Sequence, residues 1–267
     1  MYSDLERPPL NLAELRRGLD PFYSQLDIVA ETGSTNADLL ARAGEGSADR
    51  AVLIAESQSR GRGRHSRTWV SPPQAQIALS VLLQLPGIGP DELGWLPLAT
   101  GVAVVDAIRE VAEIDATLKW PNDILADGRK LCGILVEVGR PGPDPWVVVG
   151  VGINVTLQEA ELPVPEATSL LLAGAKVTDR TTLVRALTRR FAATIQAWES
   201  AGWSVETLAD EYRARCSSIG NRVRADLPGG EVLTGTADDI DSSGRLVIDG
   251  TPVSAGDVTH LRSDAPA

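Results

Sequence analysis

Residues 117–155 read TLKWPNDILADGRKLCGILVEVGRPGPDPWVVVGVGINV, and this stretch is the clearest evidence of a β-sheet in the sequence. Three apolar runs in it have the length of β-strands, at residues 117–120, 131–138 and 146–155. A short Pro- and Gly-rich segment, residues 139–145, separates the last two runs. Two strands joined in this way are typical of a hairpin, so the stretch predicts neighbouring strands of a β-sheet.

Charged residues flank the turns of this stretch. Pro121 restricts Trp120 to an extended backbone, so a strand is expected to end there, and the Asn-Asp pair that follows favours a turn. Lys130 opens the next strand after an Asp-Gly turn, so its ammonium and that of Lys119 could lie at one end of a sheet near Asp123. The alternative is two structural turns with incidental charges.

Strand and helix patterns alternate through the rest of the chain. Residues 51–57 and 76–84 are further apolar runs of strand length. Helices are expected in four segments, at residues 34–43, 91–112, 180–199 and 204–215. Pro97 is expected to bend or interrupt the second of these helices. The mixture predicts an α+β fold in which helices flank a mixed sheet.

The pattern of apolar and turn-forming residues changes after Cys216. Short β-rich runs follow, divided by Gly-containing turns, at residues 222–226, 231–239, 245–248 and 251–254. Turns at this spacing predict a small C-terminal β-barrel or sandwich of about fifty residues. We expect three parts: an N-terminal arm (residues 1–21, with a helical turn over 10–19), a main domain (residues 22–216) and the barrel (residues 217–267).

The composition excludes several classes of protein. The 267 residues carry a net charge of −11, which argues against a general DNA or RNA binder. No apolar run approaches the ~18–20 residues of a membrane span, and the N-terminus lacks the pattern of a secretory signal. Two cysteines and two histidines make neither a disulfide framework nor a multi-histidine metal centre. A reducing cytoplasm is the simplest setting.

Basic residues are concentrated in one segment, residues 57–69, which read SQSRGRGRHSRTW. This segment is named the Gly-Arg loop. It holds four arginines within eight residues. Gly61 and Gly63 would let the backbone adopt positive φ and bring its N–H groups near a ligand. Backbone N–H groups and guanidinium forks both suit phosphate and carboxylate oxygens. A solvated basic loop or a nucleic-acid-binding segment is the alternative.

Two further segments carry weaker signals. Gly150 and Gly152 end a predicted buried strand just before Asn154, where a ligand could approach closely or where the strand could simply bulge. Ser34-Thr35-Asn36 places two hydroxyls and an amide at a helix start, which a plain helix cap would also explain.

These four segments, in this order over residues 34–154, resemble the biotin protein ligase family. The combination of the Gly-Arg loop with Lys-Trp-Pro-Asn-Asp at residues 119–123 is the specific part of the resemblance, and the small C-terminal β-domain also fits. The resemblance implies a catalytic domain similar to class II aminoacyl-tRNA synthetases. It also implies the monofunctional type, without an N-terminal DNA-binding domain.

The family implies a ligase with two steps. The biotin carboxylate attacks the α-phosphate of ATP, with Mg²⁺, and gives biotinyl-5′-AMP and pyrophosphate. A lysine of a biotin carboxyl carrier domain, as in acyl-CoA carboxylases, then attacks this mixed anhydride and AMP leaves. Positioned cations would neutralise the like charges that meet in the first step.

The resemblance also implies roles for individual residues. Biotin binding is expected at Ser34, Thr35, Asn36, Gln58, Gly61, Arg62, Gly63, Arg64, Lys130, Gly133 and Leu135. Nucleotide binding is expected at Arg62, Arg64, Arg67, Trp69, Lys119, Asn122, Lys130 and Asn154. Catalysis is expected at Lys130, Arg67 and Asp123, where Asp123 would orient the acceptor amine or take its proton. The metal ligands are left unassigned.

Two other functions were weighed. A lipoate or octanoate ligase or transferase shares the fold, but its substrate has no ureido ring for the polar residues 34–36 to bind. A ligand-sensing nucleic-acid binder conflicts with the acidic balance. The oligomeric state, a monomer or a weak homodimer, stays open. We also expect residues 60–69 and 156–168 to be mobile without ligand, because polar Gly- or Pro-containing loops lack apolar anchors.

Overall fold

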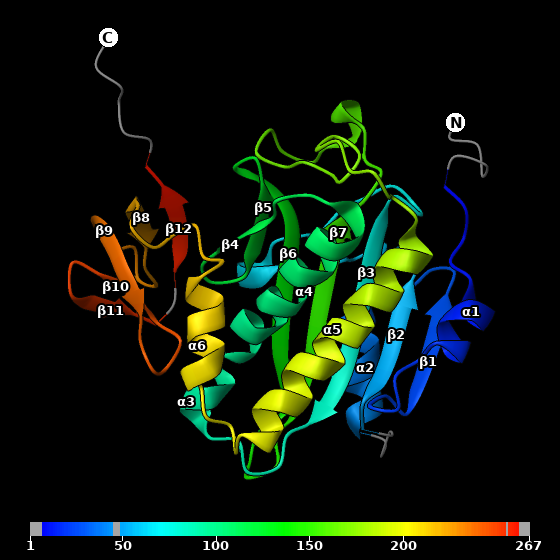
Figure 1. Ribbon diagram of the computed structural model, residues 1–267, viewed down its shortest axis with the longest axis horizontal. Helices are drawn as coiled ribbons and strands as arrows, with labels where there is room; N and C mark the ends of the chain where they lie inside the picture. Colours follow the sequence, from blue (N-terminus) through cyan, green and yellow to red (C-terminus); the bar gives the residue numbers. More distant parts are fainter. Residues whose placement is uncertain (1–6, 45–48, 255, 262–267) are drawn as a thin grey trace.

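The computed structural model describes residues 7–44, 49–254 and 256–261. A seven-stranded sheet forms the centre, and a five-stranded sheet lies to one side of it (Figure 1). The large sheet contains β1 (Gln25–Val29), β2 (Ala51–Ala55), β3 (Gln76–Gln84), β4 (Thr117–Lys119), β5 (Asp123–Ala126), β6 (Arg129–Arg140) and β7 (Trp146–Asn154). Its order is β1-β2-β3-β7-β6-β5-β4, with β1 parallel to β2 and the other neighbours antiparallel. The predicted mixed sheet is confirmed.

The hairpin predicted from residues 117–155 is the pair β6 and β7. Its register places Gly133 opposite Gly152, and Leu135 opposite Gly150. The other edge of β7 pairs with β3 along its whole length, so β7 lies in the middle of the sheet. Both β3 and β7 are buried almost throughout, as their apolar sequences require.

Helices cover both faces of the large sheet. The helices are α1 (Leu12–Arg17), α2 (Thr35–Gly44), α3 (Pro90–Leu93), α4 (Leu96–Ala112), α5 (Arg180–Ser200) and α6 (Glu206–Arg213). α4 and α5 lie side by side across one face, and α2 packs on the other (Figure 1). Val52 and Ile54 of β2 join the core under α4 and α5, whereas Leu53 packs with Leu39 of α2. Successive residues of the strand thus serve opposite layers.

The predicted helix over residues 91–112 is divided into α3 and α4. The break falls at Gly94 and Trp95, ahead of Pro97. Pro97 lies in the first turn of α4, where a missing N–H breaks no helical hydrogen bond. The expectation of an interruption is met, but Pro97 lies in the first turn of a second helix rather than bending a single one.

Asp123 begins a strand, where the sequence favoured a turn. The turn occupies residues 120–122 and contains a cis peptide bond between Trp120 and Pro121. Asp127 (φ 49°) and Gly128 (φ 73°) then form the predicted tight turn between β5 and β6. Strand β5 places Asp123 directly opposite Lys119 of β4. The short strand therefore builds the charged cluster described below.

The small sheet has the order β11-β10-β9-β8-β12 and is antiparallel. Its strands are β8 (Arg222–Asp226), β9 (Val232–Ile240), β10 (Leu246–Ile248), β11 (Thr251–Val253) and β12 (Asp257–His260). The four predicted strands are present and β12 adds a fifth. The described strands form one antiparallel sheet with β11 and β12 at its edges, which confirms a small C-terminal β-domain. The domain division at residues 216–219 stays a prediction.

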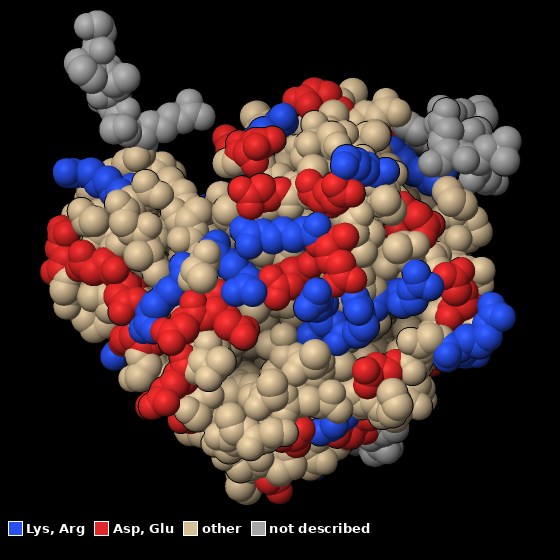
Figure 2. All heavy atoms as spheres, viewed as in Figure 1, with Lys and Arg blue, Asp and Glu red and all other residues tan. Residues whose placement is uncertain are grey.

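Charges of both signs are interspersed over the α4 and α5 face (Figure 2). Glu110 of α4 pairs with Arg189 and Arg190 of α5 there. This face therefore carries no continuous basic surface within the described residues. None of the described helices combines the length and the apolar character needed to cross a bilayer.

Candidate active site

A cavity of about 280 Å³ lies between the large sheet, the Gly-Arg loop and β12 of the small sheet. This volume is near the lower end of the ~300–1,000 Å³ usual for small-molecule sites. The predicted site residues that line it are Ser34, Thr35, Asn36, Gln58, Arg62, Gly63, Arg64, Arg67, Trp69, Lys119, Asn122, Asp123, Lys130, Gly133 and Leu135. Segments far apart in the sequence therefore meet at one place.

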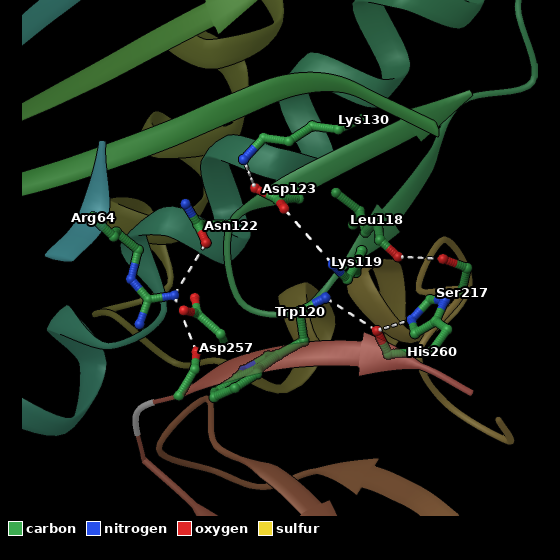
Figure 3. Close-up of polar contacts among 12 residues, drawn as sticks. Arg64, Leu118, Lys119, Trp120, Asn122, Asp123, Lys130, Ser217, Asp257 and His260 are labelled. Atoms are coloured by element: carbon green, nitrogen blue, oxygen red, sulfur yellow. Dashed lines mark hydrogen bonds and ion pairs between the residues drawn. The ribbon is translucent and has the colours of Figure 1, made fainter. Parts of the chain in front are cut away.

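Asp123 holds two lysines at one end of the cavity (Figure 3). Its Oδ1 lies 2.6 Å from the Lys130 ammonium, and its Oδ2 lies 3.9 Å from that of Lys119. Burial lowers the pKa of Lys119, and the nearby Lys130 acts in the same direction, whereas Asp123 opposes both. One carboxylate between two ammonium groups leaves a net positive cluster, which suits an anionic ligand.

The Gly-Arg loop brings three arginines to the cavity. Arg62 pairs with Glu137 at 3.1 Å, and the Arg64 guanidinium donates to Asn122 Oδ1 at 3.1 Å. Arg67 forms an ion pair with Asp257 of β12. The small sheet thus contributes an acidic group that holds a cation of the loop in place.

The glycines of this loop act differently from the prediction. The positive φ values fall at His65 (52°) and Ser66 (59°), whereas Gly63 is extended with a φ of −121°. Gly61 lies outside the cavity lining, and a Cβ there would overlap the carbonyl oxygen of Trp69. Its small size allows the close approach of Trp69, rather than that of a ligand.

Polar groups gather at a different part of the cavity. The Thr35 backbone N–H donates to Gln58 Oε1 at 2.8 Å, and the Thr35 hydroxyl lies 3.1 Å from the same oxygen. The Asn36 amide donates to the Leu135 carbonyl oxygen at 3.1 Å and to Glu137 at 2.8 Å. These bonds fix the orientation of the amide and hydroxyl groups, so the set is ordered for recognition by hydrogen bonds.

Paired glycines in β6 and β7 make room for these side chains. A Cβ on Gly150 would overlap Asn36 Oδ1, and a Cβ on Gly152 would lie 2.7 Å from the Trp69 indole. Gly133, opposite Gly152, would place a Cβ 3.0 Å from the same indole. The indole therefore lies flat against the sheet, with its Nε1 2.5 Å from Gln76 Oε1. The Lys130 ammonium is 5.7 Å from an indole ring centroid.

Asn154 is the other predicted residue outside the lining. Its side chain is buried and donates to the Thr168 carbonyl oxygen at 2.9 Å. The backbone of residues 166–168 in turn flanks Lys130, because Lys130 N donates to the Glu166 carbonyl oxygen at 2.7 Å. The structure thus places Asn154 behind the segment that flanks Lys130, and its predicted nucleotide contact stays a prediction.

Some groups of the site were not identified from the sequence. Ser80 of β3 is fully buried, with its hydroxyl 2.7 Å from Thr35 Oγ1 and 2.6 Å from Asn36 Oδ1. A lone serine in an apolar strand was the available signal. Glu137 and Asp257 carry no comparable local signal, because their roles depend on contacts between distant segments.

The carboxylates do not form a dedicated metal site. Among the described residues, no three of the His, Cys, Asp or Glu side chains are arranged to hold a metal ion. Asp123 and Asp257 are the carboxylates that line the cavity. One or two carboxylates with substrate phosphates is the usual environment of Mg²⁺, so the site fits a magnesium ion that arrives bound to a nucleotide.

Comparison with known proteins agrees with this geometry. A family model described as the biotin/lipoate A/B protein ligase family matches residues 34–154, and one for the biotin protein ligase C-terminal domain matches residues 218–261. The chain is 48% identical to the biotin–acetyl-CoA-carboxylase ligase of Mycobacterium tuberculosis over 97% of this chain and 98% of that one. It is 33% identical to the bifunctional ligase/repressor BirA of Escherichia coli, over 81% of this chain and 66% of BirA.

The architecture also matches solved structures. A biotin protein ligase from Aquifex aeolicus, in complex with biotin and ATP, superimposes with a TM-score of 0.72 and 25% identity, over 90% of this chain and 100% of that one. These matches place the chain in the biotin and lipoate protein ligase class. Within this class, the chain belongs to the biotin protein ligase family.

Proposed function

We propose that this protein is an ATP-dependent biotin protein ligase. It would form biotinyl-5′-AMP from biotin and MgATP and then transfer biotin to a lysine of a biotin carboxyl carrier domain. The observation that carries the proposal is that one cavity joins an ordered set of amide and hydroxyl groups to a cluster of five cations. The five cations are Arg62, Arg64, Arg67, Lys119 and Lys130.

The two kinds of group suit the two substrates. The side chains of Thr35, Asn36 and Gln58 can exchange hydrogen bonds with a ureido ring, which has both N–H donors and a carbonyl acceptor. The apolar walls at Ile134 and Leu135 suit an aliphatic chain. The cations suit the carboxylate at the end of that chain and the phosphates of the nucleotide.

In the first step, a carboxylate oxygen forms a bond to the α-phosphorus, and the bond from that phosphorus to the bridging oxygen of pyrophosphate breaks. Both reactants are anions, so they repel each other until positive groups lie between them. We assign this task to Lys130, because its side chain lines the cavity and is 33% exposed. Mg²⁺ supplies further positive charge on the phosphates when it is bound.

In the second step, the acceptor amine forms a bond to the biotinyl carbonyl carbon, and the bond from that carbon to the phosphate oxygen breaks. AMP leaves with the electron pair, and the amine loses a proton. Asp123 lies in the cavity wall beside both lysines, so we propose that its carboxylate orients the amine or takes this proton. Lys130 would stabilise the negative charge on the leaving phosphate.

The location of the protein and the identity of its acceptor are part of the proposal. Two free cysteines and the use of ATP fit a reducing cytoplasm. A carboxylase carrier domain is the proposed acceptor, because the Mycobacterium tuberculosis relative is named for that substrate.

The proposed function is tested by incubating the protein with ATP, Mg²⁺, biotin and a carrier domain. The intact mass of the carrier domain should increase by one biotinyl group, and a carrier with its target lysine changed to arginine should stay unmodified. Lipoate in place of biotin is the decisive comparison. Transfer of lipoate but not of biotin would reject the biotin assignment in favour of the lipoate alternative.

A further inference from the structure

The N-terminal arm is attached to the main domain by a buried ion pair. The Arg180 guanidinium lies 2.6 Å from Glu56 Oε2, and these side chains are only 4% and 11% exposed. Arg180 also donates to the Pro8 carbonyl oxygen at 2.6 Å, while Leu10 N donates to Glu56 Oε1 at 2.7 Å. The two charged groups therefore bind each other and the backbone of the arm on both sides.

This ion pair lies at the base of the Gly-Arg loop. Glu56 is the residue immediately before the loop, and its backbone carbonyl accepts from Gln74 N at 2.8 Å, where the chain returns. Arg180 donates to the Gln76 carbonyl oxygen at 3.3 Å, and the Gln76 side chain accepts from the Trp69 indole. The chain entering the loop and the chain leaving it thus meet at one arginine.

The arm makes a second connection, to the other segment beside the cavity. The Arg7 guanidinium pairs with Glu161 at 2.6 Å and donates to the Thr156 carbonyl oxygen at 3.0 Å. The same segment continues to residues 166–168, which bond to the backbone of Lys130 on both sides. The arm therefore contacts the supports of both the arginines and the catalytic lysine.

We propose that Arg180 and Glu56, with the arm at residues 7–10, are positioning residues that hold the Gly-Arg loop over the cavity. Only the expected loss of enzymatic activity rests on the proposed function, whereas the positioning of the loop does not. A buried ion pair is weak evidence for stability, because removing two charges from water offsets much of their attraction. Its geometric effect is clear here, since one planar guanidinium fixes Glu56, Pro8 and Gln76 relative to one another.

The direct test measures amide hydrogen exchange in the ligand-free protein with Arg180→Met. Exchange should become faster in residues 57–75 and in residues 156–168, while the small sheet keeps its protection. Arg185→Met is the matched control, because Arg185 also lies on α5 and pairs with Glu14 of α1, but is 49% exposed. The control should leave exchange in both segments unchanged.

A kinetic experiment measures kcat/KM for MgATP in the same variants. We expect a loss of about 10- to 100-fold in Arg180→Met, because a small displacement of binding groups has effects of this size, and none in Arg185→Met. Arg180→Lys keeps the charge but lacks the planar fork, so it should lie between the wild type and Arg180→Met in both measurements. If Arg180→Met fails to fold, Arg180→Lys replaces it as the test variant in both measurements.

The double variant Glu56→Gln with Arg180→Met separates positioning from charge balance. It removes both buried charges, so its thermal stability should recover relative to Arg180→Met, while exchange in residues 57–75 stays fast. Recovery of loop protection in the double variant would contradict the proposal. The proposal would also be contradicted if amide exchange in Arg180→Met and Arg180→Lys were unchanged, or were faster by the same factor throughout the protein. An inactive wild-type protein would instead reject the proposed function and leave the exchange results to decide the positioning.

Discussion

The Lys130 ammonium lies 2.6 Å from Asp123 Oδ1, on the neighbouring strand of the sheet. The other oxygen of this carboxylate faces Lys119 at 3.9 Å, so one acidic side chain orients two of the three lysines in the chain. An entering anion can bind the exposed part of the Lys130 ammonium without breaking this pair, because an ammonium has three N–H donors. In the proposed reaction, Asp123 would therefore hold Lys130 in place for both steps.

Replacing Lys130 should abolish most of the activity. Lys130→Ala is expected to reduce adenylate formation and biotin transfer about 100- to 1,000-fold, because it removes a positive group aimed at the charge that develops in each step. Lys176→Ala is the matched control, since Lys176 is 70% exposed and pairs with Glu113 far from the cavity. Initial rates of pyrophosphate release check both variants. Near-wild-type rates in Lys130→Ala would reject its assignment.

Arg67 should matter mainly for the nucleotide. Its ion pair with Asp257 is exposed, so phosphate can replace the carboxylate at little cost in free energy. Arg67→Ala is expected to reduce kcat/KM for MgATP about 100-fold while the protein keeps its midpoint of thermal unfolding. Arg224→Ala, an exposed arginine paired with Asp226 on β8, is the control and should keep full activity. Equal effects in the two variants would rule out a specific role for Arg67.

Gly150→Ala should weaken biotin binding. The added Cβ overlaps Asn36 Oδ1, so Asn36 must move and its hydrogen bonds to Glu137 and Leu135 must change. We expect the Kd for biotin, measured by calorimetry, to rise about tenfold, which corresponds to the loss of one well-made hydrogen bond. Gly18→Ala, whose Cβ would meet its neighbours at an ordinary 3.6 Å, should bind biotin as the wild type does. An unchanged Kd in Gly150→Ala would show that Asn36 does not contact biotin.

The stability of the protein should depend on pH through His260. Trp120 N donates to Ser218 Oγ, and this hydroxyl lies 2.9 Å from His260 Nε2, which accepts from it when the imidazole is neutral (Figure 3). Burial, with a smaller effect of Lys119, lowers the pKa of His260 below the usual 6.5. Because the unfolded chain then binds the proton more readily, stability is lost as the pH falls from about 6.5 towards the lowered folded pKa.

Urea unfolding midpoints at about pH 7.5 and about pH 5.5 test this dependence. His260→Gln should lose less stability between the two values than the wild type does. His65→Gln, which removes the other histidine of the chain, is the control and should lose as much as the wild type. The same loss in His260→Gln as in the wild type would contradict the role of His260.

Ligand should order the loops beside the cavity. We expect amide exchange in residues 60–69 and 156–168 to become slower when biotinyl-5′-AMP is bound, because the cations then gain anionic partners. Residues 222–226 of β8 provide an internal reference whose exchange should not change. Equal exchange in the two states across all three segments would contradict the prediction.

The sequence predicted those parts of the fold whose signals are local. The hairpin of β6 and β7 followed from two apolar runs and a Pro-rich turn. Strand β1, by contrast, is five residues long and only Leu26 in it is buried, so its pattern is too weak to recognise. Asp123 carried a turn signal, but pairing with Lys119 and Gly133 across two neighbouring strands made it a strand residue.

The site was predictable where residue chemistry alone indicated anion binding. The predicted site cations, Arg62, Arg64, Arg67, Lys119 and Lys130, all line the cavity. Gly61 was expected to let the backbone approach a ligand, and Gly150 and Gly152 to allow a ligand approach or a bulge, but all three make room for Trp69 or Asn36. These contacts join distant segments, and so does the Arg67–Asp257 pair. No local pattern reports such contacts, because they exist only once the chain has folded.

The proposed function requires biotinyl-5′-AMP to form in the cavity, and this intermediate can be trapped. The protein is incubated with Mg²⁺, biotin and ATP labelled at the α-phosphate, without an acceptor, and passed rapidly through a desalting column. We predict that the label elutes with the wild-type protein only when biotin is present, and that Lys130→Ala retains little of it while Lys176→Ala retains it fully. Biotin-independent retention, or equal retention by Lys130→Ala and the wild type, would contradict the account.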